Sequence, residues 1–170
     1  MRRFEIDPER STIVVEARSN VGPIAWEGTR PVGEFAFAPE GDAVAVTPPP
    51  RGWLEIRLES FTSGNRIYDS ELLRRVNAHR FPVATVELEA VGAREPDDTY
   101  QVSGRATIHG VAQRITGRIG LELLEDGSAL VTGMQVIDIR VFGLPPPTML
   151  TLKVYPEVRV HLIIKGDPID

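Results

Sequence analysis

Glycine and proline divide this chain into short runs at regular intervals, and this punctuation limits what it can fold into more than any other feature. The sequence contains 15 glycines and 14 prolines. The runs between them are roughly 6 to 12 residues long and rich in valine, isoleucine, threonine and leucine. Many short strands joined by turns at this spacing predict an all-β sandwich or barrel.

Inside the runs, apolar and polar residues alternate. In one of the clearest examples, Leu54, Ile56 and Leu58 fall on one face of a strand and charged residues fall on the other. A period of two is typical of antiparallel strands that have one face in water. The alternating runs are 53–60, 85–91, 100–108, 114–123 and 158–164.

Turn signals connect consecutive runs into hairpins. A turn containing glycine occupies 108–111, and Asp126-Gly127 is a strong hairpin signal. Consecutive hairpins form a meander, and a meander of about eight strands tends to close on itself because closure removes exposed edges. We therefore expect a closed antiparallel barrel in a single domain spanning residues 1–170.

One segment, 68–77, contains neither glycine nor proline and has helical spacing. Asp69 or Ser70 is expected to cap its N-terminus, since both side chains accept hydrogen bonds from backbone N–H groups. The sequence therefore predicts one short helix inserted between strands. Its apolar face consists of Leu72, Leu73 and Val76.

Composition excludes several classes of protein. The net charge of -5 argues against a general nucleic-acid binder, which needs a cationic surface. No uncharged stretch is long enough for an integral membrane segment. The absence of cysteine excludes disulfides, thiolate metal sites and cysteine nucleophiles. The arginines after Met1 are not followed by an apolar segment, so no secretory signal is visible and we expect a cytoplasmic location.

The sequence offers little catalytic chemistry. No common catalytic motif is present, and no set of residues has metal-ligand spacing. His79, His109 and His161 are widely separated, and we interpret them as surface residues. Asp138 stands among apolar neighbours and is a candidate functional carboxylate, although an outward strand position is the simpler interpretation. We therefore expect no catalytic residue, no metal site and no cofactor.

Small residues on the inward faces point to space inside the barrel. Gly104 and Ala106 lie on one inward face and Gly117 on the next. An eight-stranded barrel either just fills its interior or holds one small ligand. The alternative is that glycine marks a bulge or bend needed for closure, and both interpretations stay open. A cavity here would have an apolar lining and would favour an apolar chain, since each buried methylene contributes about 0.8 kcal/mol.

Several motifs occur in the order and spacing of a known family. The hairpin 104–111, with the sequence Gly-Arg-Ala-Thr-Ile-His-Gly-Val, is the most recognisable of them. Together they resemble the YceI-like proteins over nearly the whole chain. The other matching motifs are the block 59–65 with Tyr68-Asp69 and Leu72-Leu73-Arg74, the strand entry 81–86, and Phe142-Gly143.

The resemblance implies an all-β fold: an eight-stranded antiparallel, lipocalin-like barrel with one short helix covering an end. It also implies non-enzymatic binding, transport or storage of a polyisoprenoid or similar long-chain amphipathic lipid in a hydrophobic interior. One alternative is a filled barrel that acts through its surface as an interaction or stress-associated protein. Another is a barrel enzyme for a lipid-like substrate. Related barrels pair through exposed strands, which makes a homodimer a hypothesis for this chain.

The expected ligand-binding residues follow from strand position and from the resemblance. Residues on inward faces are Val102, Gly104, Ala106, Ile108, Ile119 and Leu121. Expected lining or mouth residues are Trp26, Phe35, Phe37, Phe81, Met134, Phe142 and Met149, although each aromatic also suits an ordinary core. Candidates for holding a polar head group are Asn65, Tyr68 and Arg74, whose alternative roles are capping and turn structure.

Overall fold

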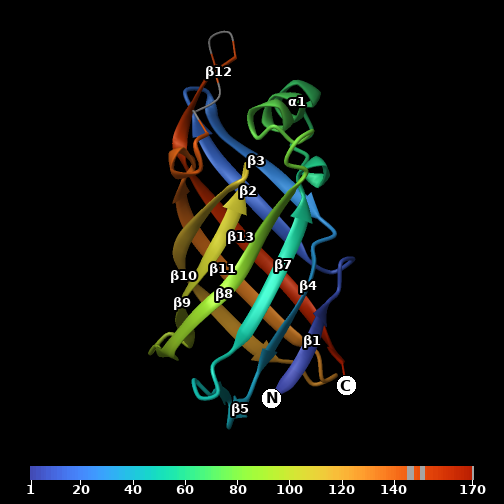
Figure 1. Cartoon of the computed structure of the whole chain (residues 1–170), viewed down its shortest axis with the longest axis vertical. Coiled ribbons are helices and arrows are strands. Elements are labelled where there is room, and N and C mark those ends of the chain that lie inside the picture. The colour runs from blue at the N-terminus through green and yellow to red at the C-terminus, as the bar shows by residue number, and fades with distance from the viewer. Residues whose placement is uncertain (145–147, 150–151, 170) are drawn as a thin grey trace.

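Antiparallel strands dominate the structure, a computed structural model that describes residues 1–144, 148–149 and 152–169 (Figure 1). One short α-helix and two 3-10 helices (η) interrupt them. The elements in chain order are β1 (Arg2–Ile6), β2 (Thr12–Ser19), β3 (Gly22–Thr29), β4 (Val32–Phe37), β5 (Pro39–Glu40), β6 (Ala43–Val44), β7 (Arg51–Arg57), η1 (Leu58–Ser60), α1 (Arg66–Arg75), β8 (Val83–Arg94), β9 (Thr99–Ile108), β10 (Val111–Leu123), β11 (Ala129–Asp138), η2 (Ile139–Phe142), β12 (Thr148–Met149) and β13 (Leu152–Ile169).

Eight of these strands form a closed ring. Hydrogen bonds connect β1, β4, β7, β8, β9, β10, β11 and β13 in that order, and β13 then pairs with β1. All of these pairings are antiparallel. The predicted eight-stranded barrel with one short α-helix is therefore confirmed.

The long strand β13 pairs with β1 near its C-terminal end and with β2 nearer its N-terminal end. Its C-terminal residues pair with β1, with Gly166 opposite Ile6, and its N-terminal residues pair with β2, with Ile163 opposite Thr12. Between β1 and β2, the hydroxyl of Ser11 accepts the N–H of Lys165 at 3.0 Å. Strands β1 and β2 thus act as one long strand with a short interruption, and β3 extends the sheet beyond β2.

Both ends of the barrel are covered. Helix α1 lies over one end, and the small hairpin of β5 and β6 lies at the other (Figure 1). A buried hydrogen bond connects this hairpin to β9: the N–H of Val44 donates to the hydroxyl of Tyr100 at 2.9 Å. Within the described residues, no helix has the length and apolar character needed to cross a bilayer.

Helix α1 begins earlier than the sequence predicted. Asn65 is the N-cap, and its side-chain oxygen accepts hydrogen bonds from the N–H groups of Ile67 and Tyr68 at 2.9 and 3.2 Å. The prediction of Asp69 or Ser70 as the cap was wrong. The carboxylate of Asp69 instead accepts both the N–H and the hydroxyl of Ser63, so it fixes the loop before the helix.

The predicted strand over 53–60 was also too long at its end. Strand β7 stops at Arg57, and 58–60 form η1. Leu58 is buried, and its N–H donates to the carbonyl of Pro82 at 2.9 Å instead of continuing a ladder. This turn directs the chain toward α1.

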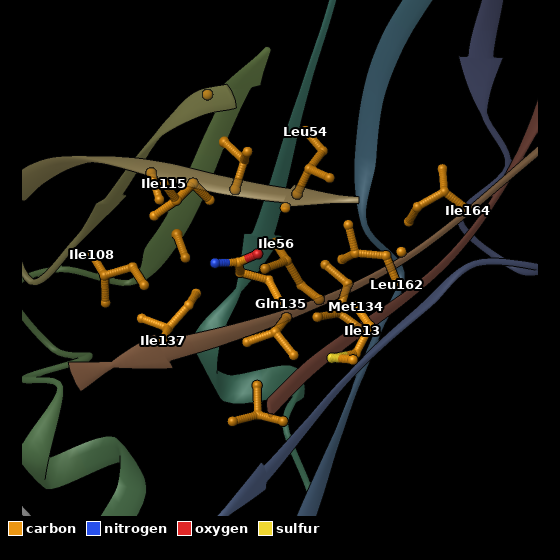
Figure 2. Close-up of a pocket in the computed structure, with 18 of the residues that line it drawn as sticks. Ile13, Leu54, Ile56, Ile108, Ile115, Met134, Gln135, Ile137, Leu162 and Ile164 are labelled. Carbon is orange, nitrogen blue, oxygen red and sulfur yellow. The ribbon is translucent and has the colours of Figure 1, made fainter. Parts of the chain in front are cut away.

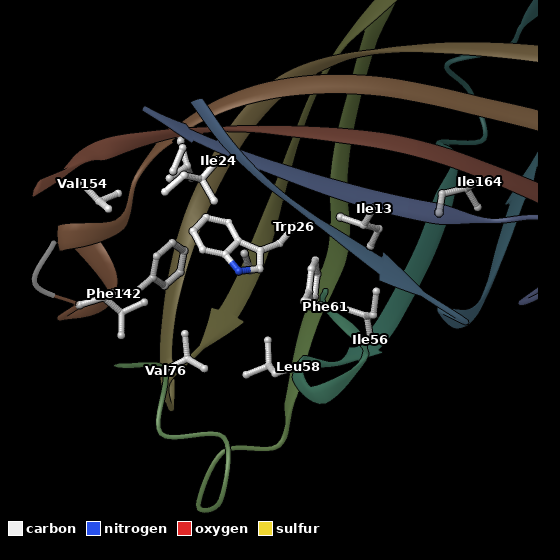
Figure 3. Packing of buried hydrophobic residues seen from close by; sticks show 14 of the residues in the cluster. Ile13, Ile24, Trp26, Ile56, Leu58, Phe61, Val76, Phe142, Val154 and Ile164 are labelled. Atoms are coloured by element: carbon white, nitrogen blue, oxygen red, sulfur yellow. The ribbon is translucent and has the colours of Figure 1, made fainter. Parts of the chain in front are cut away.

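Two clusters of buried side chains close the barrel ends. Under α1, Trp26 and Phe142 pack with Phe61 and with side chains from η1 and the end of the helix (Figure 3). At the opposite end, the ring of Phe4 stacks on those of Phe35 and Phe37, with ring centres 5.1 and 5.2 Å apart. The interior between the two clusters determines whether the barrel can hold a ligand.

Candidate functional site

A cavity of about 380 Å³ lies inside the barrel. Its lining is almost entirely aliphatic and aromatic, because the inward face of each strand carries the apolar residues of the alternating pattern. Figure 2 shows side chains from β2, β7, β9, β10, β11 and β13 around this space. They include Ile13, Leu54, Ile56, Ile108, Ile115, Ile137, Leu162 and Ile164.

The cavity contradicts the filled interior that the interaction-protein alternative required. The contacts of the inward glycines show why no larger residue stands at these positions. Gly104 lines the cavity, but a Cβ at this position would lie 2.6 Å from the carbonyl oxygen of Glu87, next to a bulge in β8. Glycine here therefore permits the close approach of two strands as well as leaving space. A Cβ on Gly117 would lie 2.6 Å from Oε1 of Gln135, so Gly117 makes room for that side chain.

The structure brings most of the predicted ligand-binding residues together around the cavity. Their position is observed, and their contact with a ligand stays a prediction. Met134 only borders the cavity at the wall, since its side chain is 49% exposed. The predicted residues that line the cavity are Trp26, Phe35, Phe37, Tyr68, Val102, Gly104, Ala106, Ile108, Ile119, Leu121, Met134 and Phe142.

Two predicted residues are not placed there. The prediction for Phe81 is corrected, because this residue precedes β8 and is not among the residues that line the cavity. Its ring packs edge-on against His109, with ring centres 5.3 Å apart, and the guanidinium of Arg80 lies 5.1 Å from its centre. The prediction for Met149 falls on a side chain outside the described part of the structure.

The expected head-group residues divide in the same way. Tyr68 lines the cavity under α1, whereas Asn65 is occupied as the helix cap. Arg74 donates to the carboxylate of Glu71 at 2.7 Å, and its side chain is 66% exposed. Capping and helix structure therefore account for Asn65 and Arg74.

A charged pair near the cavity was not predicted. Glu71 and Arg75 both line the α1 end, and the guanidinium of Arg75 lies 2.7 Å from the carboxylate of Glu71. Burial opposes ionisation of Glu71, but hydrogen bonds from Arg75 and Arg74 outweigh it and lower the pKa of Glu71. The spacing of three and four residues on a helix was the signal that could have revealed this network.

The buried indole of Trp26 carries an unmatched donor. Its side chain is 5% exposed, and its Nε1 has no hydrogen-bond partner among the described residues. A buried donor without an acceptor costs about 1–3 kcal/mol. The surrounding cluster encloses this atom, so it is separated from the open part of the cavity.

Asp138, the candidate functional carboxylate, has a structural role. Its side chain accepts the backbone N–H of Arg140 at 3.0 Å and caps η2, and its carboxylate lies 2.7 Å from the Arg140 guanidinium. The hydrogen bond from the Arg140 side chain lowers the pKa of Asp138. The carboxylate is not part of the cavity lining. In the described residues, no group of three or more histidine, aspartate or glutamate side chains is placed to hold a metal ion.

Gln135 is a polar cavity residue that the sequence interpretation missed. It follows Val131 and Gly133 on the inward row of β11 and precedes Ile137. Figure 2 shows its amide among the isoleucine and leucine side chains of the lining. Period-two alternation through β11 was the signal that could have identified it.

Comparisons with known proteins place this barrel in a family. The chain is similar to Burkholderia cenocepacia BcnA, with 18% identity, coverage of 95% of this chain and 99% of that one, and a TM-score of 0.81. It is also similar to a polyisoprenoid binding domain from Saccharophagus degradans implicated in plant cell wall breakdown, with 14% identity, coverage of 98% of each chain and a TM-score of 0.74. The Campylobacter jejuni YceI protein shares 15% identity over 82% of this chain and 81% of its own, with a TM-score of 0.64.

At these identities the solved structures establish a shared fold. None of the curated proteins compared with the chain matches it. A family model described as the YceI-like domain matches residues 4–165. Because this model spans nearly the whole sequence and the barrel agrees with it, the protein belongs to the YceI-like family.

Proposed function

We propose that this protein binds a polyisoprenoid or similar long-chain amphipathic lipid inside its barrel and carries or stores it without chemical change. The apolar cavity is the observation that supports this proposal most directly. Its volume of about 380 Å³ is within the usual range for small-molecule sites, roughly 300–1,000 Å³. The polyisoprenoid binding domain among the similar structures supports the same class of ligand. The cytoplasmic location and the homodimer stay predictions.

Energetics favour a long chain over a short one. Burying five methylenes contributes only about 4 kcal/mol. The loss of translational and rotational freedom on association costs about 4–15 kcal/mol, so a short chain gains no net affinity. The few polar atoms of the lining give a small polar ligand little compensation for losing water.

The first test is chemical identification of what the protein carries. Organic extraction of the purified protein, followed by mass spectrometry, should yield a lipid with repeating isoprene units or another long apolar chain. The stripped protein should then rebind a defined isoprenoid alcohol such as farnesol, as measured by calorimetry. If the extract is empty and the stripped protein binds no long-chain alcohol, the proposal is wrong.

A matched pair of variants tests whether binding occurs in the cavity. Val86 lines the cavity, whereas Val32 is 46% exposed on β4. Changing Val86 to phenylalanine places about four more carbons in the ligand space, which corresponds to a loss of about 3 kcal/mol, or roughly a hundredfold in affinity. Val32→Phe adds the same atoms outside and should leave the affinity unchanged. Equal affinities for the two variants would show that the lipid binds elsewhere.

A further inference from the structure

The wall of the barrel is not closed by backbone pairing everywhere. Strands β10 and β11 pair from Leu123 opposite Ala129 up to Arg118 opposite Met134. Beyond that point β10 continues through 111–117 and β11 through 135–138, and the structure pairs neither stretch with the other. We refer to these two stretches as the β10–β11 seam. The seam has no backbone ladder to separate the interior from the outside.

The cavity approaches the surface at this seam. Gly117, Gly133 and Gln135 border both the cavity and a groove on the outer face of β8 to β11. Two of these residues are glycines, so the wall is thin here. On the outer face beside them, the apolar side chains of Met134 and Val136 are 49% and 47% exposed. The cavity and the outer groove therefore meet at this seam, where the side chain of Gln135 packs against Gly117 and lies between them.

Gln135 is a polar residue on the inward row of β11 at this seam. Its Nε2 donates to the carbonyl of Val136 at 3.1 Å, and the amide makes no other hydrogen bond with the described residues. A second N–H and the carbonyl oxygen are therefore available to a bound molecule. An uncharged amide that offers both a donor and an acceptor suits a neutral hydroxyl or carbonyl oxygen.

The other polar groups at the cavity are less suitable. The carboxylate of Glu71 already binds two guanidinium groups at the α1 end. The Nε1 atom of Trp26 is enclosed by protein. Thr116 and Arg118 also border both the cavity and the groove, but both are exposed on the outer row of β10. Gln135 lies on the inward row of β11 and keeps unused hydrogen-bonding capacity.

We propose that Gln135 is a specificity-determining residue: its amide hydrogen-bonds a neutral oxygen of the bound lipid, so that the polar end of the lipid lies at the β10–β11 seam and the apolar chain lies in the cavity. This inference rests on the proposed function. It assigns the polar end to the side wall and not to the α1 end. The preferred ligands are then lipids with a terminal hydroxyl or carbonyl group.

The test compares two ligands of the same chain length, farnesol and the hydrocarbon farnesene, by calorimetry on stripped protein. The native protein should prefer farnesol. Gln135→Met keeps the length of the side chain but removes the amide, and it should weaken farnesol binding by roughly two- to tenfold while leaving farnesene binding unchanged. Gln135→Leu is a second variant with the same expectation. Gln101→Met makes the same chemical change on the exposed face of β9, where the side chain borders the outer groove but not the cavity, and it should leave farnesol binding unchanged.

The outcomes separate this inference from the function on which it rests. If the native protein binds both ligands equally, or if Gln135→Met and Gln101→Met have the same affinity for farnesol, then Gln135 does not hydrogen-bond the oxygen of the lipid, although the cavity still binds the lipid. If the native protein binds neither ligand, the proposed function fails and this inference fails with it. Thermal unfolding of each variant verifies that the barrel is intact.

Discussion

Replacing Phe4 by alanine tests how the barrel closes. Phe4 lies on β1, the strand that completes the ring, and it is 0% exposed where its ring packs against the rings of Phe35 and Phe37. Truncating a fully buried phenylalanine costs about 3–5 kcal/mol, the transfer of the lost atoms and the cavity left behind both contributing. Since domains are stable by only about 5–15 kcal/mol, this loss is a large fraction of the total.

Urea unfolding followed by tryptophan fluorescence measures the effect. With a urea dependence of about 2 kcal/mol per molar, the midpoint should fall by roughly 2 M. Val21→Ala shortens a residue that is 71% exposed and should change the stability by less than about 0.5 kcal/mol. A double-mutant cycle with Phe37→Ala should give a coupling of about 0.5–1.5 kcal/mol, the usual value for a ring pair. A midpoint shift below about 0.5 M for Phe4→Ala would refute the idea that this stack holds the ring closed.

Three further predictions concern the wall and the helix. Gly104→Ala should destabilise the protein by more than about 1 kcal/mol because the added carbon would press on a β8 carbonyl, whereas Gly92→Ala, whose added carbon would lie 3.5 Å from its nearest neighbour, should change the thermal midpoint little. Asn65→Ala should cost about 1 kcal/mol in urea unfolding through loss of the helix cap; no change would show that the cap is dispensable. The pKa of Glu71 is lowered in the folded state, so its ionised form stabilises the fold above the unfolded pKa and this contribution disappears as the pH falls through the folded one. Glu71→Gln should therefore destabilise at neutral pH and converge with the native protein in acid, and a constant difference between the two would contradict the pKa assignment.

The strands could be predicted because alternation leaves only one face for each side chain. Within β9, the inward positions of Val102 and Ala106 follow from period two alone, and the structure agrees. The helix cap could not be predicted in the same way. Asn65, Asp69 and Ser70 are all good capping residues by type. The structure decides among them, because Asn65 accepts the N–H groups at the start of the helix and Asp69 instead accepts hydrogen bonds from Ser63.

Positions on the cavity wall follow from the alternation within single strands, whereas the contacts between neighbouring strands do not. Alternation assigns Gln135 to the interior, but the point where β10 and β11 separate depends on the course of both strands and leaves no local signal. Phe81 shows the converse error. It is an aromatic residue within a family-like motif, but it lies before β8, so no pleat directs it inward.

The pairing of β1 with the last residues of β13 brings the two chain termini together, as Figure 1 shows. Geometrically, the ring of strands then has no obligatory starting point. A short peptide linker between the ends, with new termini cut into the turn beside the exposed Glu125, should produce a circular permutant that keeps the same barrel and the same cavity. The order in which the polypeptide is synthesised would then be separable from the architecture that it forms.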